Sequence, residues 1–125
     1  MKFMIIVFLF AISFISGEVY NLDESSEVSI SKEGSLQMSI SSNPTTGYYW
    51  YIDESTLGVV TTDNLDGDYI SSQSHLLGAG GSQIFTLYCT DLCVEGENTS
   101  VKLEYMRSWE KEPIEIVDVT VYIVS

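Results

Sequence analysis

Val101-Lys102-Leu103-Glu104-Tyr105-Met106 is the clearest repeating run in this sequence, because its side chains fall into two alternating sets. Successive side chains of a β-strand point to opposite faces, so a period of two predicts a strand with one buried face. Val101, Leu103 and Tyr105 are expected to face a core. The residues between them are expected to face outward.

The same period returns along the chain, and polar turns separate the runs. Further β-prone runs lie at 28–30, 36–40, 48–52, 59–61, 69–70, 84–89 and 114–123. No stretch beyond residue 17 shows the period of a convincing amphipathic helix. Seven to eight short strands in about 100 residues predict an all-β fold, an immunoglobulin-like β-sandwich. The Cys…Trp…Cys spacing of antibody domains is absent, so this prediction rests on strand number and turn spacing.

Two details of strand pairing follow from the pattern. Lys32-Glu33-Gly34 separates the runs 28–30 and 36–40, which predicts a hairpin. In the last run, Ile114 and Ile116 share one parity, and the other parity holds Val117, Val119, Val121 and Ile123. A regular strand cannot place both sets on one face, so a β-bulge is predicted near Ile116-Val117.

The first seventeen residues have the order of a secretory signal peptide. Lys2 is followed by an almost unbroken apolar run from Phe3 to Ile15, and then by the small residues Ser16 and Gly17. The apolar run is shorter than the roughly 20 residues of a membrane-spanning helix, although an uncleaved anchor is the alternative. We expect residues 18–125 to be one domain in the secretory pathway, either secreted or held in lysosome- or phagosome-like vesicles.

The mature chain is strongly acidic. Without Lys2 it keeps four basic residues against 18 acidic ones, a formal charge of −14. Nucleic acid and anionic membranes would repel such a chain, so neither is an expected partner. We expect a monomer as the default state, with no cofactor and no metal.

Four further features have alternative interpretations. Cys89 and Cys93 are the only cysteines, and their spacing leaves a disulfide and two free thiols equally open. Asn98-Thr99-Ser100 is an N-glycosylation sequon at Asn98. The acidic segment 63–68 lacks the Asp and Glu that a calcium loop requires at its ends, so we interpret it as an acidic turn. His75, the only histidine, is interpreted as a solvated loop residue.

Three loop segments are candidate binding elements. Asn43-Pro44-Thr45-Thr46-Gly47 has a stiff proline and a permissive glycine on either side of two hydroxyls, although an ordinary strand connection fits equally well. Gly78-Ala79-Gly80-Gly81 would let a main chain lie close to another surface, and a flexible turn is its alternative. Arg107-Ser108-Trp109 contains two residue types that are common in binding hot spots, and core packing of Trp109 is its alternative.

Together, in this order, the three segments resemble the signature of the chagasin family of cysteine peptidase inhibitors. That signature is an Asn-Pro-Thr-Thr-Gly loop, a Gly-x-Gly-Gly loop and an Arg-Pro-Trp loop. The first two match fully, and Ser108 stands where the third has proline. A serine there would leave the third loop less stiff. The resemblance covers nearly all of residues 18–125.

The resemblance implies a specific mode of action. The segments would form the B–C, D–E and F–G loops of an immunoglobulin-like fold and enter the cleft of a papain-like (cathepsin L-like) cysteine peptidase as a wedge. Thr45 and Thr46 would approach the catalytic Cys and His, and residues 78–81 would lie along the cleft. Arg107 and Trp109 would contact its primed-side wall. The chain would then be a reversible, non-covalent inhibitor and not an enzyme; the alternative is a secreted immunoglobulin-like recognition or adhesion module.

Overall fold

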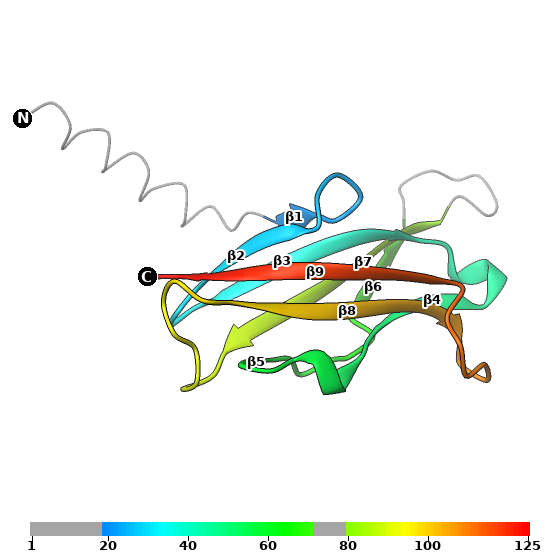
Figure 1. The fold of residues 1–125 in the computed structure, drawn as a ribbon. Helices are drawn as coiled ribbons and strands as arrows, with labels where there is room; N and C mark the ends of the chain where they lie inside the picture. The colour runs from blue at the N-terminus through cyan, green and yellow to red at the C-terminus, as the bar shows by residue number, and fades with distance from the viewer. Residues whose placement is uncertain (1–18, 72–79) are drawn as a thin grey trace, which may run out of the picture.

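The computed structural model of the chain describes residues 19–71 and 80–125, and these form two facing β-sheets (Figure 1). Residues 1–17, the expected signal peptide, lie outside the described residues. Within the described ranges the only helical segments are two short 3-10 turns, η1 (Pro44–Thr46) and η2 (Glu54–Thr56). None of the helices in those ranges is long and apolar enough to span a membrane. The strands are β1 (Val19–Asn21), β2 (Glu27–Ser31), β3 (Ser35–Ser42), β4 (Tyr48–Ile52), β5 (Val60–Thr61), β6 (Asp68–Ser71), β7 (Gly81–Cys89), β8 (Asn98–Arg107) and β9 (Glu115–Val124).

The first sheet is built on the long antiparallel pair β3 and β7. Their register runs from Ser35 opposite Tyr88 to Ser42 opposite Gly81. β1 runs parallel to β3 on its outer side, and β5 and β6 pair with two parts of the other edge of β7. The second sheet has the order β2-β9-β8-β4, with β2 parallel to β9 and the other pairs antiparallel.

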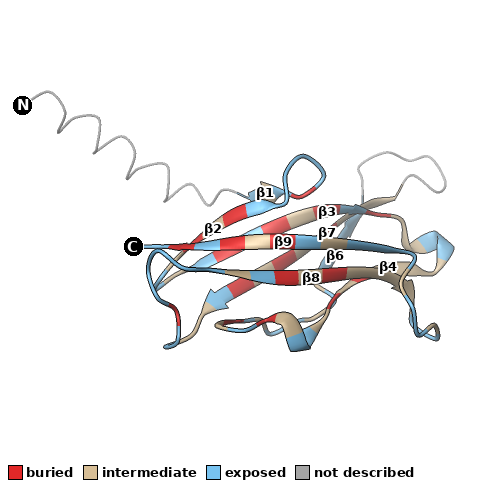
Figure 2. Cartoon of the chain, in the orientation of Figure 1, coloured by how far each residue is buried: buried red, intermediate tan, exposed pale blue. Residues whose placement is uncertain are grey.

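Alternating side chains of the two sheets meet in one core, which Figure 2 shows as buried positions spaced along the strands. The predicted inward set of β8 is buried at Val101 and Leu103 and partly buried at Tyr105. The neighbouring strand β9 and the strands of the facing sheet supply further buried residues, among them Val119, Val121, Met38, Phe85 and Leu87. The prediction of an all-β, immunoglobulin-like sandwich is therefore confirmed.

The predicted β-bulge near Ile116-Val117 is wrong. β9 pairs with β8 in an unbroken register from Asn98 opposite Tyr122 to Tyr105 opposite Glu115. The conflict of parity is resolved by exposure instead, because Ile116 is 48% exposed on the outer face. A single apolar side chain on a surface is common in proteins and does not require a change of register.

The predicted hairpin around Lys32-Glu33-Gly34 is also wrong. The chain does turn there, and the Gly34 N–H donates to Ser31 O at 2.9 Å. However, β2 before the turn pairs with β9, whereas β3 after it pairs with β1 and β7. The turn thus carries the chain from one sheet to the other across the edge of the core.

Cys89 and Cys93 form a disulfide, one of the two states that the sequence left open. Their Cα atoms are 5.9 Å apart, within the usual range for a disulfide. Cys89 ends β7, and the Cys93 side chain is buried, with its sulfur 3.5 Å from Val59 O. The disulfide closes the turn between β7 and β8, which lies at the end of the sandwich where the C-terminus emerges (Figure 1).

Candidate functional site

Of the three segments singled out in the sequence, the first and third connect β3 to β4 and β8 to β9. They emerge at the same end of the sandwich, which is also the end where Gly81, from the second segment, begins β7 (Figure 1). Strand register explains why. Ser42, at the end of β3, lies opposite Gly81, and Tyr48, at the start of β4, lies opposite Arg107. Each segment therefore begins or ends beside another. We call this end of the molecule the loop end.

The first segment forms the 3-10 turn η1, with Pro44 in its first turn and Gly47 after it. The Asn43 side chain accepts hydrogen bonds from the N–H of Thr45 at 3.3 Å and from its hydroxyl at 2.6 Å. The Thr46 hydroxyl donates to Asn43 O at 2.9 Å. Both hydroxyl hydrogens are therefore donated within the turn. The threonines, which the sequence suggested as presented groups, also hold their own loop in shape.

Gly47 ends the turn with φ +87°, a left-handed backbone conformation that residues with a side chain rarely adopt. A Cβ at this position would also lie 3.5 Å from Cη2 of Trp109. The first and third segments therefore lie against each other. Glycine is favoured at position 47 by its backbone angle, because a Cβ would make only an ordinary van der Waals contact with the Trp109 ring.

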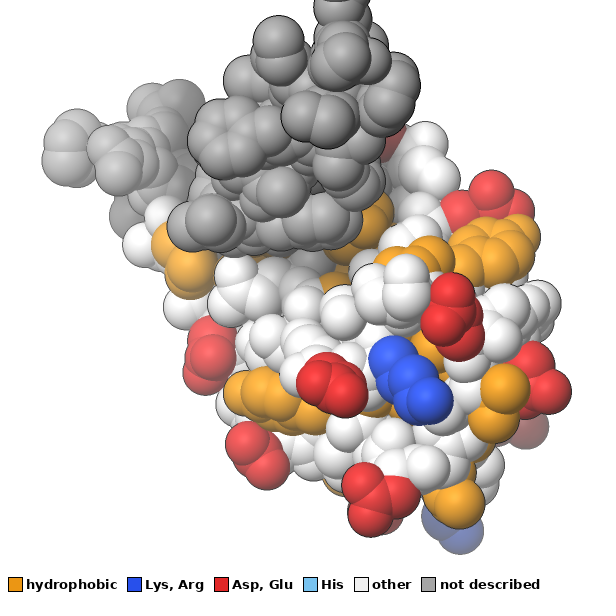
Figure 3. All heavy atoms as spheres, turned by 90° about the vertical axis from the view of Figure 1, so that its left-hand side faces the viewer, with side chains coloured by type: hydrophobic (Ala, Val, Ile, Leu, Met, Phe, Trp, Pro, Cys, Tyr) orange, Lys and Arg blue, Asp and Glu red, His pale blue; other side chains and the backbone are white. Residues whose placement is uncertain are grey.

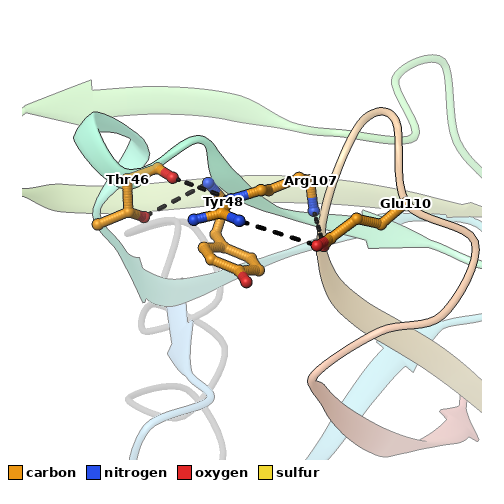
Figure 4. Close-up of polar contacts among 4 residues, drawn as sticks. All are labelled: Thr46, Tyr48, Arg107 and Glu110. Atoms are coloured by element: carbon orange, nitrogen blue, oxygen red, sulfur yellow. Dashed lines mark hydrogen bonds and ion pairs between the residues drawn. The ribbon is translucent and has the colours of Figure 1, made fainter.

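Arg107 joins the first and third segments directly (Figure 4). Its Nε donates to Thr46 O at 3.3 Å, and its guanidinium carbon lies 4.4 Å from the centre of the Tyr48 ring. The Trp109 ring centre is 5.8 Å from the same carbon. A cation over an aromatic face is attracted by the ring's quadrupole, typically by about 0.5–1 kcal/mol at exposed sites. Glu110 lies on the other side of Arg107 and forms an ion pair with it at 3.9 Å.

Tyr48 belongs to a stack of aromatic rings that runs from the core to the loop end. The Trp50 and Tyr105 ring centres are 4.7 Å apart, and those of Tyr105 and Tyr48 are 5.4 Å apart. Trp50 is buried, and its indole Nε1 donates to Ser41 O at 3.0 Å. At the Tyr48 end of the stack the Arg107 guanidinium follows, and beyond it Trp109 is 73% exposed. The stack anchors the loops on the core and leaves Trp109 projecting from it.

Only the last two residues of the second segment are described. Gly78, Ala79 and also His75 lie outside the described residues. Gly80 lies against the first segment, since a Cβ there would be 3.3 Å from Cβ of Asn43. At Gly81 a Cβ would overlap Ile70 O on β6, so glycine is required there for β6 to pair with β7. All three segments therefore meet at the loop end.

Sequence reasoning missed Gln83, a fully buried residue of β7 behind the loops. Its Oε1 accepts from Trp50 N at 2.8 Å and from the Ser42 hydroxyl at 2.8 Å. Its Nε2 donates to Trp50 O at 2.9 Å and to Asp66 O at 2.7 Å. The Gln83 amide thus binds both backbone groups of Trp50 on β4, as a neighbouring strand would. Because β7 and β4 belong to different sheets, these hydrogen bonds connect the two sheets. The signal in the sequence was its inward parity with Phe85 and Leu87.

Glu110 was also missed, and Ser108 is simply exposed between Arg107 and Trp109. Asn98 is exposed at the first position of β8, at the far end of the strand from Arg107. No group of three or more potential metal ligands occurs in the part of the chain that the structure describes.

Comparison with known proteins shows what this arrangement belongs to. The family model "Chagasin family peptidase inhibitor I42" matches residues 29–123. The chain belongs to the chagasin family. Chagasin of Trypanosoma cruzi is 33% identical over 94 residues, which cover 70% of this chain and 78% of that protein. The resemblance inferred from the three segments is confirmed.

A solved structure supports the same fold. The crystal structure of a cysteine protease inhibitor from Entamoeba histolytica matches this member of the chagasin family with a TM-score of 0.60. The match covers 85% of this chain and 93% of that chain at 24% identity, so it supports the fold alone. The family model describes peptidase inhibitors, and on this ground the prediction that the chain is not an enzyme is confirmed.

Proposed function

We propose that this chagasin-family protein inhibits papain-like cysteine peptidases by inserting its loop end into the active-site cleft. The bound loops block access to the catalytic Cys and His, and the inhibition is reversible and non-covalent. Thr45 and Thr46 approach the catalytic pair, and residues 78–81 lie along one side of the cleft. Arg107 and Trp109 contact the opposite wall.

The convergence of three family segments on one end, with Trp109 projecting, is the observation that carries this proposal. Trp and Arg dominate binding hot spots because they combine large apolar area with directional contacts. Internal hydrogen bonds hold the first loop in shape before binding. A preformed loop loses less conformational entropy on association, so more of the contact energy becomes affinity.

The shape of the first loop also supports inhibition without cleavage. Residues 44–46 form a 3-10 turn, in which Gly47 N–H donates to Pro44 O at 2.8 Å. A peptide closed into such a turn is not extended, whereas substrates of papain-like enzymes bind as extended chains. The Thr45–Thr46 peptide bond therefore lies out of register for hydrolysis.

Titration of papain and of a cathepsin L-like enzyme with residues 18–125 tests this function. The triple variant Thr45→Ala, Thr46→Ala, Trp109→Ala is expected to raise the inhibition constant at least about thirtyfold, the factor for losing one hot spot of about 2 kcal/mol. Leu92→Ala is the matched control, because Leu92 is 68% exposed in the disulfide turn at the opposite end.

Two other outcomes would argue against the inhibitory function or for a different one. A native chain that does not slow either enzyme at micromolar concentration would refute the inhibitory function. If a different binding partner is found and the triple variant still binds it, the chain acts as an immunoglobulin-like recognition or adhesion module instead.

We also propose that the protein follows the secretory pathway as a monomer and carries a glycan at Asn98. Asn98 is exposed and lies at the end of the sandwich opposite the loop end, so a glycan there would leave the loops accessible. Acidic side chains outnumber basic ones on that end of the surface (Figure 3). Expression of the full chain in eukaryotic cells should yield secreted protein whose mass falls on treatment with an N-glycosidase. Asn98→Gln should abolish that mass change and leave inhibition intact.

A further inference from the structure

Residues 107–110 form a β-turn at the tip of the third loop. The Glu110 N–H donates to Arg107 O at 3.0 Å, so Ser108 and Trp109 are its two central residues. No described residue other than glycine has a positive φ, which excludes turns of types II, I′ and II′ here and leaves type I as the hydrogen-bonded form. Proline is favoured at the first central position of a type I turn because it fixes the φ angle there.

Position 108 would accept that proline. Arg107 ends β8 and is therefore extended, the conformation required of a residue that precedes proline. Within the described residues, the Ser108 N–H donates no hydrogen bond to another group. A proline would thus remove no internal hydrogen bond. This chain has serine at 108, which does not fix φ, so stiffening of the turn has to come from other contacts.

Glu110 supplies that contact. Its carboxylate Oε1 accepts the Arg107 N–H at 3.1 Å, while its own N–H donates to Arg107 O. The two residues therefore close the turn from both sides. The ion pair of its Oε2 with Arg107 Nη1 is longer, at 3.9 Å, and is partly exposed, so it contributes less than the hydrogen bond.

The consequence extends to both loops of the site. The Arg107 backbone fixed by Glu110 directs the guanidinium toward Thr46 O, at 3.3 Å, and over the Tyr48 ring. Figure 4 shows Arg107 held between Glu110 on one side and Thr46 and Tyr48 on the other. Trp109 follows directly in the same turn. Ordering of the turn therefore orders the large apolar side chain that is the most exposed among the described residues.

We propose that Glu110 is a positioning residue that replaces the stiffening effect of a proline at position 108 and orders Trp109 before the target binds. Its effect on inhibition rests on the proposed function. Its effect on the turn does not, and the two can be measured separately.

The first measurement is a double-mutant cycle on inhibition. Glu110→Ala is expected to raise the inhibition constant about tenfold, because it removes the acceptor of the Arg107 N–H. Glu110→Gln keeps an acceptor oxygen and should stay within about threefold of the native value. Adding Ser108→Pro to Glu110→Ala should bring the inhibition constant back to within about threefold of the native value. In the native chain the same change should have a smaller effect, since the effects of coupled sites are not additive. Glu112→Ala, exposed two residues further on, is the control and should have no effect.

The second measurement needs no peptidase. In 15N relaxation of the free protein, the Trp109 indole N–H should become more mobile in Glu110→Ala and regain its order when Ser108→Pro is added. The buried Trp50 indole serves as an internal reference. An unchanged Trp109 signal in Glu110→Ala would overturn the proposal. The proposal would also be overturned if Ser108→Pro changed the inhibition constant by the same factor in the native chain and in Glu110→Ala. If no peptidase is inhibited but the relaxation result holds, the proposed function fails and the role of Glu110 in the turn stands.

Discussion

Replacing Gln83 by leucine is expected to cost this fold about 4 kcal/mol of unfolding free energy. The change removes the partners of Trp50 N–H and Trp50 O, and Trp50 is buried. Each buried backbone group left without a partner costs about 1–3 kcal/mol, so the two together cost about 2–6 kcal/mol. The buried Ser42 hydroxyl also loses its acceptor, which adds to the cost, whereas Asp66 O lies on an exposed residue and can turn to water, so it adds little. Domains have only about 5–15 kcal/mol of stability in total, so the loss is large.

Urea unfolding followed by tryptophan fluorescence measures this loss, because Trp50 is the residue that the Gln83 amide binds. Gln37→Leu is the matched control. It makes the same chemical change on the exposed face of β3 and should alter stability by less than about 0.5 kcal/mol. If Gln83→Leu costs less than about 1 kcal/mol, the buried amide does not hold the two sheets together, and the reasoning is wrong.

Three further changes separate the loop end from the rest of the fold. Arg107→Met keeps the aliphatic stem but loses the hydrogen bond to Thr46 O and the cation over Tyr48. It should weaken inhibition about tenfold and change the free energy of unfolding by less than about 1 kcal/mol. Lys32→Met, at the other end of the sandwich, is the control for both measurements. Replacement of Cys89 and Cys93 by serine should cost at most about 2 kcal/mol in thermal unfolding, because the closed loop is short, and a change in the inhibition constant would contradict its remote position. The pKa of Asp53 is held below its usual value, chiefly by the hydrogen bond from the Ser55 hydroxyl and then by the Ser55 N–H. The pKa of Asp53 is thus lower in the folded state than in the unfolded state. This stabilisation is present above the unfolded pKa and is lost as the pH falls through the folded pKa. Asp53→Asn should therefore reduce the loss of unfolding free energy at acidic pH, and an unchanged pH profile of that free energy would contradict this.

The sequence predicted a run within every described strand except β1, and on β8 it predicted which face is buried, because burial follows a period of two. Val101 and Leu103 on β8 were assigned to the core by parity, and both are buried. Pairing was harder to predict. The turn at Gly34 shows where the chain reverses but not that β2 and β3 enter different sheets.

The error at Ile116 has a different cause. The predicted bulge assumed that every apolar residue of the last run must be buried, but Ile114 and Ile116 are both exposed. Hydrophobic residues often remain on the surface, so an apolar residue of the wrong parity is weak evidence for a bulge.

The candidate site was predicted from three loop segments whose order resembles the chagasin-family signature; taken singly, each segment also had an ordinary structural interpretation. The residues that hold the loops were not predicted. Gln83 acts on Trp50, 33 positions away in sequence, and Arg107 reaches back 61 positions to Thr46. Such contacts depend on how the two sheets face each other. For Gln83 the parity gave a signal, since a polar side chain at an inward position requires buried partners.

Protection of the catalytic thiol measures whether the loop end occupies the cleft of a papain-like peptidase. Papain saturated with residues 18–125 would be treated with iodoacetamide, and the rate at which the catalytic Cys is alkylated would be followed by mass spectrometry. If the loop end fills the cleft, alkylation slows in proportion to the fraction of enzyme bound, and full activity returns when the unalkylated complex is diluted. Alkylation of the bound enzyme at the rate of free papain would show that the cleft remains open and would contradict the account.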